Sequence, residues 1–367
     1  MKLELSRKEF ADAVTAAQAA ASARTSINIL QHLLIEASDH VRITGCDGEM
    51  FVVREIPAMV TEPGSICLHA KTLNDIVASL PDGTLSIETF NDSSTALLKQ
   101  GFSEVRLPFL DPEDFPPVPE IGRDGHLTLS MDTLRAAVDS VLYAVSADAH
   151  RAVLTGVLFA YNGHTLTLVA TDTHRLAVRK LTQEGIGDST SAIVPDKALR
   201  AIKSLPIAED SPVELFFGGG RVGVETGNAK VVCQLLAGTY PNWERVVPAE
   251  FTRTWSVEAD QMLDKVKRAM IFARDNANRV RFKGDGDQII IAARSEDGGD
   301  AKDELAMIPQ NGDVEIAFNG KYVRDVLDAI NGPGVRVEMT ESSRPAVFRP
   351  ADEGDNYFCV IMPMALA

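Results

Sequence analysis

The segment "LHAKTLNDIVASLPDG" (68–83) recurs in related form twice further along the chain, as "VPDKALRAIKSLPIAED" (194–210) and "FNGKYVRDVLDAINGPG" (318–334). Each copy has a lysine near the start of a short run with apolar residues at helical spacing, and each ends at a stop that contains proline or glycine. Apolar residues at i, i+3, i+4 and i+7 are typical of a helix with one buried face. The lysines of successive copies are 126 and 124 residues apart. A period of this length predicts three copies of one structural unit.

A second expected helix stands at the start of each unit, and in the first unit Ser6 and Glu9 have the spacing of a capping box. Between the helices, alternating segments such as "HVRITGCDGEMFVVREI" (40–56) predict strands joined by tight turns. Each unit closes with an apolar strand that runs into a segment containing proline, and "VIMPMALA" (360–367) is the third of these. The six segments expected to be helical are 6–24, 71–80, 131–146, 195–205, 258–274 and 319–330.

Two segments that contain proline, "DPEDFPPVPEIGRDG" (111–125) and "PNWERVVPAEFTR" (241–253), are candidate linkers between the units. The sequence therefore predicts three similar α+β domains of about 120 residues each, which is an ordinary domain size. We place these domains at residues 1–120, 121–248 and 249–367.

The composition is that of an ordinary globular protein, with 45% hydrophobic and 24% charged residues. No apolar run approaches the length of a membrane span or of a signal-peptide core, which favours a cytoplasmic protein. The four cysteines are far apart and form no C-x-x-C pair, so we expect reduced, mostly buried thiols and no zinc site. The formal charge of −16 at first argues against a nucleic-acid partner.

The chain has no phosphate-binding glycine motif of the P-loop or dinucleotide type, so we expect no cofactor. The densest polar group is "ATDTHRLAV" (170–178), in which Asp172, His174 and Arg175 resemble a fragment of a catalytic or metal-binding set. No second carboxylate or histidine nearby completes such a set, and local hydrogen bonding accounts for these residues equally well. We therefore expect a protein that is not an enzyme, and we keep as the alternative a hydrolase or transferase that uses these three side chains.

With the threefold repeat established, the chain resembles the bacterial β sliding clamp, the processivity factor of the replicative DNA polymerase. The resemblance covers essentially the full length. Its most specific parts are "RAVLTGVLFAYNGHTLTLVATDTHRLAV" (151–178), "YPNWERVVP" (240–248) and "VIMPMAL" (360–366). It implies a head-to-tail homodimer whose six domains close into a ring around duplex DNA, without sequence specificity, with the helices lining the hole and the antiparallel sheets outside.

The acidic charge is compatible with such a ring. The six expected helices contain 14 Lys and Arg against 11 Asp and Glu, so the remainder of the chain carries a charge of −19. A mildly positive lining suits a ring that holds DNA by enclosure, because extensive phosphate neutralisation gives tight, salt-sensitive binding that would oppose sliding. Ordinary solvated helix faces would explain the charge of any single helix nearly as well. The residues expected to face DNA are Arg24, Arg151, Lys197, Arg200 and Lys203.

The resemblance also implies a hydrophobic pocket between the second and third domains that receives short linear peptides from polymerases, the clamp loader and repair proteins. Flexible methionine side chains in such a pocket adapt to varied apolar anchors. The residues at the matching positions are Leu154, Thr171, Thr173, His174, Arg175, Leu176, Pro241, Arg245, Val246, Val360, Met362, Pro363, Met364 and Leu366. The chain departs from the family pattern here, since Thr173 stands where glycine is usual, Ala365 stands where a basic residue is common, and Ala367 extends the usual end. Ala152 and Val153 stand where the family often has aromatic residues that contact DNA. The residues at the family's apolar dimer interface are Val105, Ile271 and Phe272.

Overall fold

The computed structural model describes nearly the whole chain. Its internal contacts divide the chain into two compact parts, here called unit 1 and unit 2, which do not coincide with the three sequence repeats. The described residues are 1–22, 25–122, 126–182, 185–186, 189–296, 298–311, 313–330, 332–352 and 356–366. Unit 1 comprises Met1–Arg135, Glu184–Asp188 and Val194–Leu235. Unit 2 comprises Ala136–Gln183, Ser189–Ile193 and Leu236–Ala367. The division runs through the middle repeat, which contributes residues to both units.

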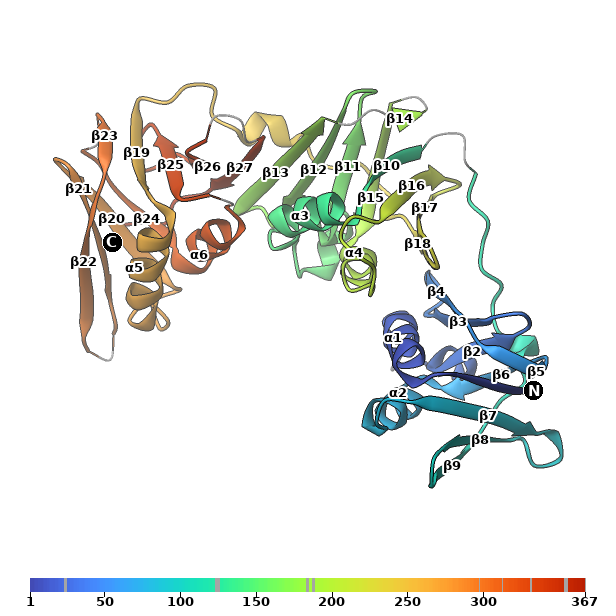
Figure 1. The fold of residues 1–367 in the computed structure, drawn as a ribbon. Coiled ribbons are helices and arrows are strands. Elements are labelled where there is room, and N and C mark those ends of the chain that lie inside the picture. Colours follow the sequence, from blue (N-terminus) through green and yellow to red (C-terminus); the bar gives the residue numbers. More distant parts are fainter. Residues whose placement is uncertain are drawn as a thin grey trace. The chain divides into compact units, whose positions relative to one another are not determined.

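All six expected helices are present, two for each repeat (Figure 1). They are α1 (Arg7–Gln18), α2 (Ala70–Ser79), α3 (Met131–Leu142), α4 (Asp196–Lys203), α5 (Ala259–Ile271) and α6 (Gly320–Ala329). The first helix begins where the capping box predicts, because the Ser6 side chain accepts a hydrogen bond from the Glu9 N–H at 3.4 Å. Three helices end three or more residues earlier than expected, α1 at Gln18, α3 at Leu142 and α5 at Ile271. After each, the chain continues in tighter turns with hydrogen bonds to the carbonyl oxygen three residues back.

Unit 1 contains two antiparallel sheets. The five-stranded sheet has the order β5 (Met59–Glu62), β1 (Lys2–Ser6), β7 (Thr84–Phe90), β8 (Thr95–Gln100) and β9 (Ser103–Pro108). The nine-stranded sheet has the order β14 (Gly185–Ile186), β10 (His126–Ser130), β16 (Pro212–Gly218), β17 (Arg221–Thr226), β18 (Ala229–Gln234), β4 (Met50–Ile56), β3 (Val41–Cys46), β2 (His32–Ala37) and β6 (Gly64–His69). The pairing of β4 with β18, with Val52 opposite Val231, makes one continuous sheet from strands of the first and middle repeats.

Unit 2 repeats this arrangement. Its nine-stranded sheet has the order β15 (Thr190–Pro195), β11 (Gly156–Tyr161), β12 (Thr165–Thr171), β13 (Arg175–Thr182), β27 (Tyr357–Ile361), β26 (Ala346–Pro350), β25 (Gly334–Met339), β19 (Arg253–Glu258) and β23 (Ile308–Gln310). Its four-stranded sheet has the order β22 (Asp300–Ala306), β21 (Gln288–Arg294), β20 (Arg279–Asp285) and β24 (Glu315–Asn319). Here β13 of the middle repeat pairs with β27 of the third, with Ala177 opposite Cys359.

Two helix pairs, α1 with α2 in unit 1 and α5 with α6 in unit 2, pack over the sheets and bury their apolar faces there. In unit 1, α1 and α2 contact each other, and Phe10 and Leu73 lie in one fully buried cluster with strand residues such as Ile35. In unit 2, α5 and α6 lie side by side beside the four-stranded sheet (Figure 1). The closest approach is at Gly45 in β3, where a Cβ atom would lie 1.9 Å from the carbonyl oxygen of Ala17. Only glycine allows α1 to pack this closely on the sheet.

The four cysteines are free and buried, as the sequence predicted. Burial raises the pKa of the Cys46 thiol to about 11 and that of the Cys67, Cys233 and Cys359 thiols to about 12. In the described part of the chain, no helix is both long enough and apolar enough to cross a membrane.

Candidate functional site

The turn between β12 and β13 is built from its own side chains. The Asp172 carboxylate accepts hydrogen bonds from the N–H groups of His174 and Arg175, at 2.9 and 3.0 Å. The Thr171 hydroxyl accepts from the Thr173 N–H at 3.1 Å and donates to the Arg175 carbonyl oxygen at 2.6 Å. Thr173 has a positive φ of 78°. This left-handed conformation strains a residue that has a Cβ, and the hydrogen bonds around the turn hold it in place.

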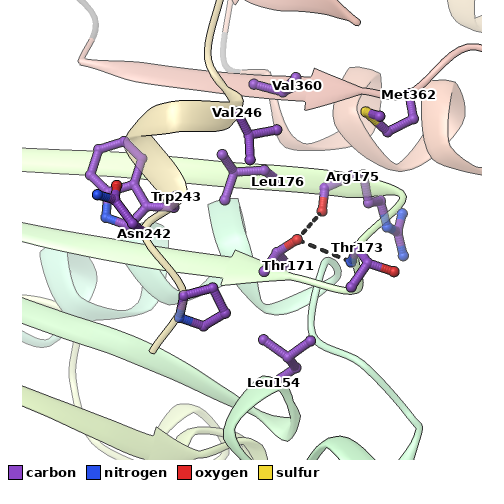
Figure 2. A pocket seen from close by; sticks show the side chains of 11 residues that line it. Leu154, Thr171, Thr173, Arg175, Leu176, Asn242, Trp243, Val246, Val360 and Met362 are labelled. Carbon is purple, nitrogen blue, oxygen red and sulfur yellow. Dashed lines mark hydrogen bonds between the residues drawn. The ribbon is translucent and has the colours of Figure 1, made fainter. Parts of the chain in front are cut away.

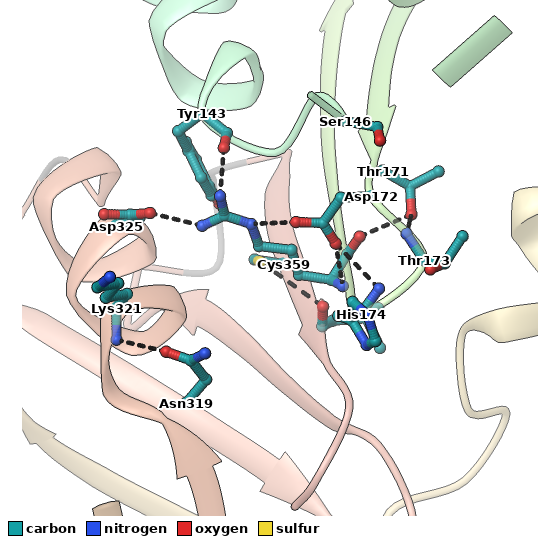
Figure 3. A network of polar contacts seen from close by, with 12 residues as sticks. Tyr143, Ser146, Thr171, Asp172, Thr173, His174, Asn319, Lys321, Asp325 and Cys359 are labelled. Carbon is teal, nitrogen blue, oxygen red and sulfur yellow. Dashed lines mark hydrogen bonds and ion pairs between the residues drawn. The ribbon is translucent and has the colours of Figure 1, made fainter. Parts of the chain in front are cut away.

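Arg175 leaves this turn to form a buried polar network (Figure 3). Its guanidinium pairs with Asp172 at 3.1 Å and with Asp325 of α6 at 2.6 Å, and it also donates to the carbonyl oxygen of Tyr143. It lies over the rings of Tyr143 and Tyr322, at 5.1 and 4.5 Å from their centroids. Burial alone would lower the pKa of Arg175, but the hydrogen bond to Asp325 and the two carboxylate charges outweigh burial and raise it. The guanidinium therefore stays charged and joins β13 of the middle repeat to α6 of the third.

Further contacts between the middle and third repeats surround this network. The Tyr143 and Tyr357 hydroxyls are hydrogen-bonded at 2.6 Å. Burial raises the pKa of Tyr143 well above its ordinary value, so the phenol stays neutral. Beyond the end of β27, the Met362 N–H donates to the His174 carbonyl oxygen at 2.9 Å. These contacts hold the segment that follows β27 against the β12–β13 turn.

Beside this turn lies an apolar cavity of about 180 Å³, here called the first cavity (Figure 2). Its walls come from the segment before β11, the β12–β13 turn, the short helical segment Trp243–Val246 with the two residues before it, and β27 with the residue after it. The lining residues are Leu154, Thr171, Thr173, Arg175, Leu176, Pro241, Asn242, Trp243, Val246, Val360 and Met362. A buried apolar cavity of about 150 Å³ holds a benzene-sized group, so this one has room for one large apolar side chain. Val246 and Met362 are 44% and 39% exposed, which makes the cavity accessible from solvent.

Nine of the fourteen residues expected at a peptide pocket line the first cavity, although they come from segments up to about 200 residues apart in the chain. Two further residues, Asn242 and Trp243, line the first cavity and were not predicted. Both lie within the motif "YPNWERVVP" (240–248), so a tryptophan in a linker that contains proline was the available signal. Side chains in such a linker can only be assigned to a cavity once its path across the sheet is known.

The other five expected pocket residues do not line the first cavity. His174 points its ring toward Tyr322, with the ring centroids 6.4 Å apart, and Arg245 is exposed on the Trp243–Val246 segment. Pro363 and Met364 follow Met362 and are half-buried. The Met364 N–H donates to the carbonyl oxygen of Ala317 in β24 at 2.8 Å. Leu366 is exposed and lies beside Arg279 and Arg281 instead.

The geometry does not support the alternative of a hydrolase or transferase that uses Asp172, His174 and Arg175. The Asp172 carboxylate is engaged by two backbone N–H groups and by Arg175, and Arg175 is engaged by two carboxylates. Neither is therefore available as a base or an acid. Among the described residues, no group of three or more His, Cys, Asp or Glu side chains could hold a metal ion.

Two of the basic residues expected to face DNA are ion-paired on α4. Lys197 is 2.8 Å from Asp47 and 2.7 Å from Glu49, both in the turn after β3. Burial acts to lower the pKa of Lys197, but the hydrogen bonds to these two carboxylates raise it. Arg200 pairs with Asp196, one helical turn earlier, at 3.2 Å. Acidic neighbours thus partly compensate the positive charge on this helix.

The other three expected DNA-facing residues differ in their surroundings. Arg151 lies 3.5 Å from Asp148 and donates to the Thr173 hydroxyl at 3.1 Å. Lys203 is exposed in the last turn of α4. Arg24 lies outside the described residues.

The expected dimer-interface residues lie at exposed edges of the two units. Val105 is half-buried on β9, which is the edge strand of the five-stranded sheet. Ile271 is exposed at the end of α5, and Phe272 follows it half-buried. The four-stranded sheet of unit 2 has β22 at its edge, so each unit has a long strand with one side unpaired among the described strands.

Comparisons with known proteins agree across the whole chain. Three family models match in order: the N-terminal domain of the DNA polymerase III beta subunit over residues 1–119, its central domain over 128–242 and its C-terminal domain over 244–365. The chain is 31% identical over 375 residues to a beta sliding clamp of Staphylococcus aureus, covering 99% of both chains.

Two solved structures show the same fold over their entire length. The DNA polymerase sliding clamp from Bacillus subtilis superposes with a TM-score of 0.94 at 27% identity, covering 100% of both chains. A sliding clamp from Pseudomonas aeruginosa, solved bound to griselimycin, superposes with a TM-score of 0.94 at 28% identity, also covering 100% of both chains.

Proposed function

Because the chain belongs to the DNA polymerase III beta subunit family, the bacterial beta sliding clamps, we propose that it forms a homodimeric ring that encircles duplex DNA and tethers the replicative polymerase. The observation that carries this proposal is the match of all three clamp domains, in order, over nearly the whole chain. We retain residues 1–120, 121–248 and 249–367 as the domains of each subunit.

Ring closure uses the two sheet edges. An edge strand presents unpaired backbone N–H and C=O groups, which pair readily with a strand of another chain. β9 of one subunit would lie beside β22 of the next, with Val105, Ile271 and Phe272 contributing apolar contact. Two such head-to-tail contacts close a dimer, because a heterologous interface forms a ring when its rotation closes.

The charge distribution is consistent with holding DNA by enclosure. The six helices contain 12 Lys and Arg against 10 Asp and Glu, within a chain whose formal charge is −16. Helices this weakly basic would bind phosphates loosely, and loose binding permits sliding. Arg24, Arg151, Lys197, Arg200 and Lys203 are the proposed contacts, without sequence specificity, and the carboxylates paired with Lys197 and Arg200 would weaken their attraction to phosphate.

The first cavity is the proposed docking site for short linear motifs of the polymerase, the clamp loader and repair proteins. Its lining is largely apolar and includes a flexible methionine at the rim, Met362, which suits varied apolar anchors. The binding of griselimycin by the Pseudomonas aeruginosa clamp shows that a related clamp accepts a ligand. The protein would thus act as a non-enzymatic hub, located in the cytoplasm with the replisome on the nucleoid.

Retention on circular DNA tests the enclosure. The protein would be loaded on nicked circular plasmid by a clamp loader with ATP, freed of unbound protein by gel filtration, and then exposed to a restriction enzyme that cuts once. A ring is retained on the circle and lost after linearisation. Equal retention on circular and linear plasmid would contradict enclosure.

Binding of a labelled peptide tests the docking site separately. Replacing the two exposed rim residues, as in Val246→Ser with Met362→Ser, removes apolar contact without opening the buried core. We expect this variant to bind a fluorescein-labelled peptide with a Leu-Phe anchor at least tenfold more weakly than the wild type, because each lost apolar contact is worth about 1 kcal/mol. The matched control is Met59→Ser with Ile308→Ser, which replaces two exposed apolar residues elsewhere. Equal affinity of both variants would refute the assignment.

A further inference from the structure

The two edge strands proposed to close the ring both have exposed charged side chains at alternate positions. On β9 these are Glu104 and Arg106. On β22 they are Asp300, Lys302 and Glu304. Each strand therefore presents a short series of charges of alternating sign along one face of its sheet.

The residues between these charges point to the helix side of each sheet. Leu107 of β9 is buried in the cluster that includes residues of α1 and α2. Leu305 of β22 is buried, and the Asp303 carboxylate pairs with Arg268 of α5 at 3.0 Å. Successive side chains of a strand point to opposite faces, so the alternating charges lie on the face away from the helices in both strands. If the helices of both subunits cover one face of the joined sheet, the charges of β9 lie opposite those of β22, because a one-residue shift would turn buried residues outward.

The order of the charges distinguishes the antiparallel registers that remain. In one register Glu104 lies opposite Lys302. Arg106 then lies opposite Asp300, and both pairs are of opposite charge. A shift by two residues brings Glu104 opposite either Glu304 or Asp300, and a shift by four leaves at most one pair of opposite charge. Opposite charges directly across a ladder stabilise it and like charges destabilise it, so the first register is favoured.

The strand direction and the apolar residues agree with this register. Within the described residues, the strands of the five-stranded and four-stranded sheets pair antiparallel with their neighbours, and an antiparallel ladder continues that pattern. The register also places Val105 opposite Ala301, two residues from Gly299. A Cβ atom on Gly299 would lie 3.0 Å from the Phe272 ring, so that ring lies on the helix side beside this position. The half-buried Val105 and Phe272 would therefore meet as diagonal neighbours across the ladder.

We propose that β9 and β22 of two copies of this chain pair antiparallel, with Glu104 opposite Lys302 and Arg106 opposite Asp300. This inference rests on the proposed ring closure and adds its register. Within its own unit Glu104 already lies 3.0 Å from Lys99, so excess charge at the edge is not what selects the partner. The order of the charges selects it, and a second copy of this chain has the matching order. A strand whose exposed charges all had one sign would repel one of the two residues on β9.

Charge reversal tests the first pair, with fluorescence-detected sedimentation at nanomolar protein and low salt as the measurement. In Glu104→Lys two lysines lie opposite each other at both interfaces of the ring, and in Lys302→Glu two carboxylates do. We expect each variant alone to form the homodimer with a Kd at least tenfold above that of the wild type, because both interfaces gain a repulsion. The difference should shrink as NaCl is raised, since salt screens exposed charges.

An equimolar mixture of these two variants restores a pair of opposite charges at both interfaces. The mixture should therefore form a heterodimer with a Kd several-fold below that of either variant alone, and native mass spectrometry with one variant labelled with nitrogen-15 identifies it. The matched controls, Glu209→Lys and Arg344→Glu, reverse one exposed charge in each unit away from the two edges. Alone or mixed, they should dimerise as the wild type does.

The second pair tests the direction of the ladder. Arg106→Glu should also weaken the dimer about tenfold, and Asp300→Lys in the same chain should restore it, whereas Glu304→Lys should not. Restoration by Glu304→Lys instead would indicate a parallel or shifted ladder and would overturn the register. Dimers indifferent to every one of these reversals would overturn the register but leave the ring standing. A wild type that stays monomeric at micromolar concentration and is not retained on circular plasmid would contradict the ring, and the register with it.

Discussion

Removal of the Arg175 guanidinium is predicted to destabilise unit 2 by about 3 kcal/mol, as the loss of one partner from a buried ion pair commonly costs. The side chains of Arg175, Asp172 and Asp325 are 9%, 16% and 20% exposed, so the network is mostly shielded from water. In the variant Arg175→Gln both carboxylates lose a charged partner, and the rings of Tyr143 and Tyr322 lose the cation that lies over them.

The predicted loss falls at the lower end of the 3–5 kcal/mol range because neither carboxylate would be left without a partner. Asp172 would keep the N–H groups of His174 and residue 175. Asp325 would keep Arg324, which lies 2.6 Å away on the same helix. Asp325→Asn alone removes one of the two ion pairs of Arg175, so its cost should be smaller, about 1–2 kcal/mol.

Urea unfolding followed by tryptophan fluorescence measures this effect in unit 2 alone, because both tryptophans of the chain, Trp243 and Trp255, belong to that unit. With an m-value of about 2–3 kcal/mol per M, a loss of 3 kcal/mol lowers the midpoint by roughly 1 M. The double variant Arg175→Gln with Asp325→Asn should lose less than the sum of the two single changes, since the second change removes a charge that the first left less well compensated. Strictly additive losses, or a loss below about 1 kcal/mol for Arg175→Gln, would refute the reasoning.

Three further predictions concern other parts of the chain. Burial lowers the pKa of His32, whose ring N–H donates to the Asn28 carbonyl oxygen at 2.9 Å, so the folded state prefers the neutral ring. This contribution to stability is complete above the unfolded-state pKa of about 6.5 and is lost as the pH falls below it. Between pH 7.5 and 5.5 the free energy of unfolding of the His32→Gln variant should therefore fall by less than that of the wild type, as measured by urea unfolding and far-UV circular dichroism. An equal fall in both proteins would contradict a buried, neutral His32 ring. Gly45→Ala should destabilise unit 1 by more than about 2 kcal/mol, because the new Cβ would lie against a backbone carbonyl that cannot move without shifting α1; hydrogen exchange in α1 and β3 would show it, and unchanged protection would count against this close contact. Thr173→Gly should change stability by less than about 1 kcal/mol, since relief of the left-handed strain is offset by the greater entropy of glycine in the unfolded chain; a loss above about 2 kcal/mol, seen in the tryptophan-detected urea midpoint, would show that the threonine side chain is needed.

Much of the fold follows from local pattern. Helical spacing of apolar residues predicted all six helices, and the capping box predicted the start of α1. Where the prediction failed, at the ends of α1, α3 and α5, the periodic pattern continued into residues whose N–H groups bond three residues back, in tighter turns than those of an α-helix. Helix ends depend on capping and on what the next residues pack against, which a periodic pattern does not contain.

The walls of the first cavity were predicted in part, and by resemblance more than by pattern. Nine of the expected residues line the first cavity, but Trp243 was missed and Leu366 does not line it. The ion pair between Arg175 and Asp325 joins residues 150 positions apart, and that of Lys197 with Asp47 spans the same separation. No motif or spacing in the sequence indicates which of its many carboxylates each cation meets.

The sequence by itself determined the threefold repeat, the α+β class and the six helices, because each depends on residues that are neighbours along the chain. Only the tertiary structure decided that strands of adjacent repeats join in one sheet, as β4 does with β18 and β13 with β27. It also decided that Val360 and Met362, from an apolar end in an acidic chain, line an apolar cavity together with residues of the middle repeat. The physical reason is that sheet pairing, cavity walls and ion pairs depend on distances in space, which are set only when all the buried faces are packed together.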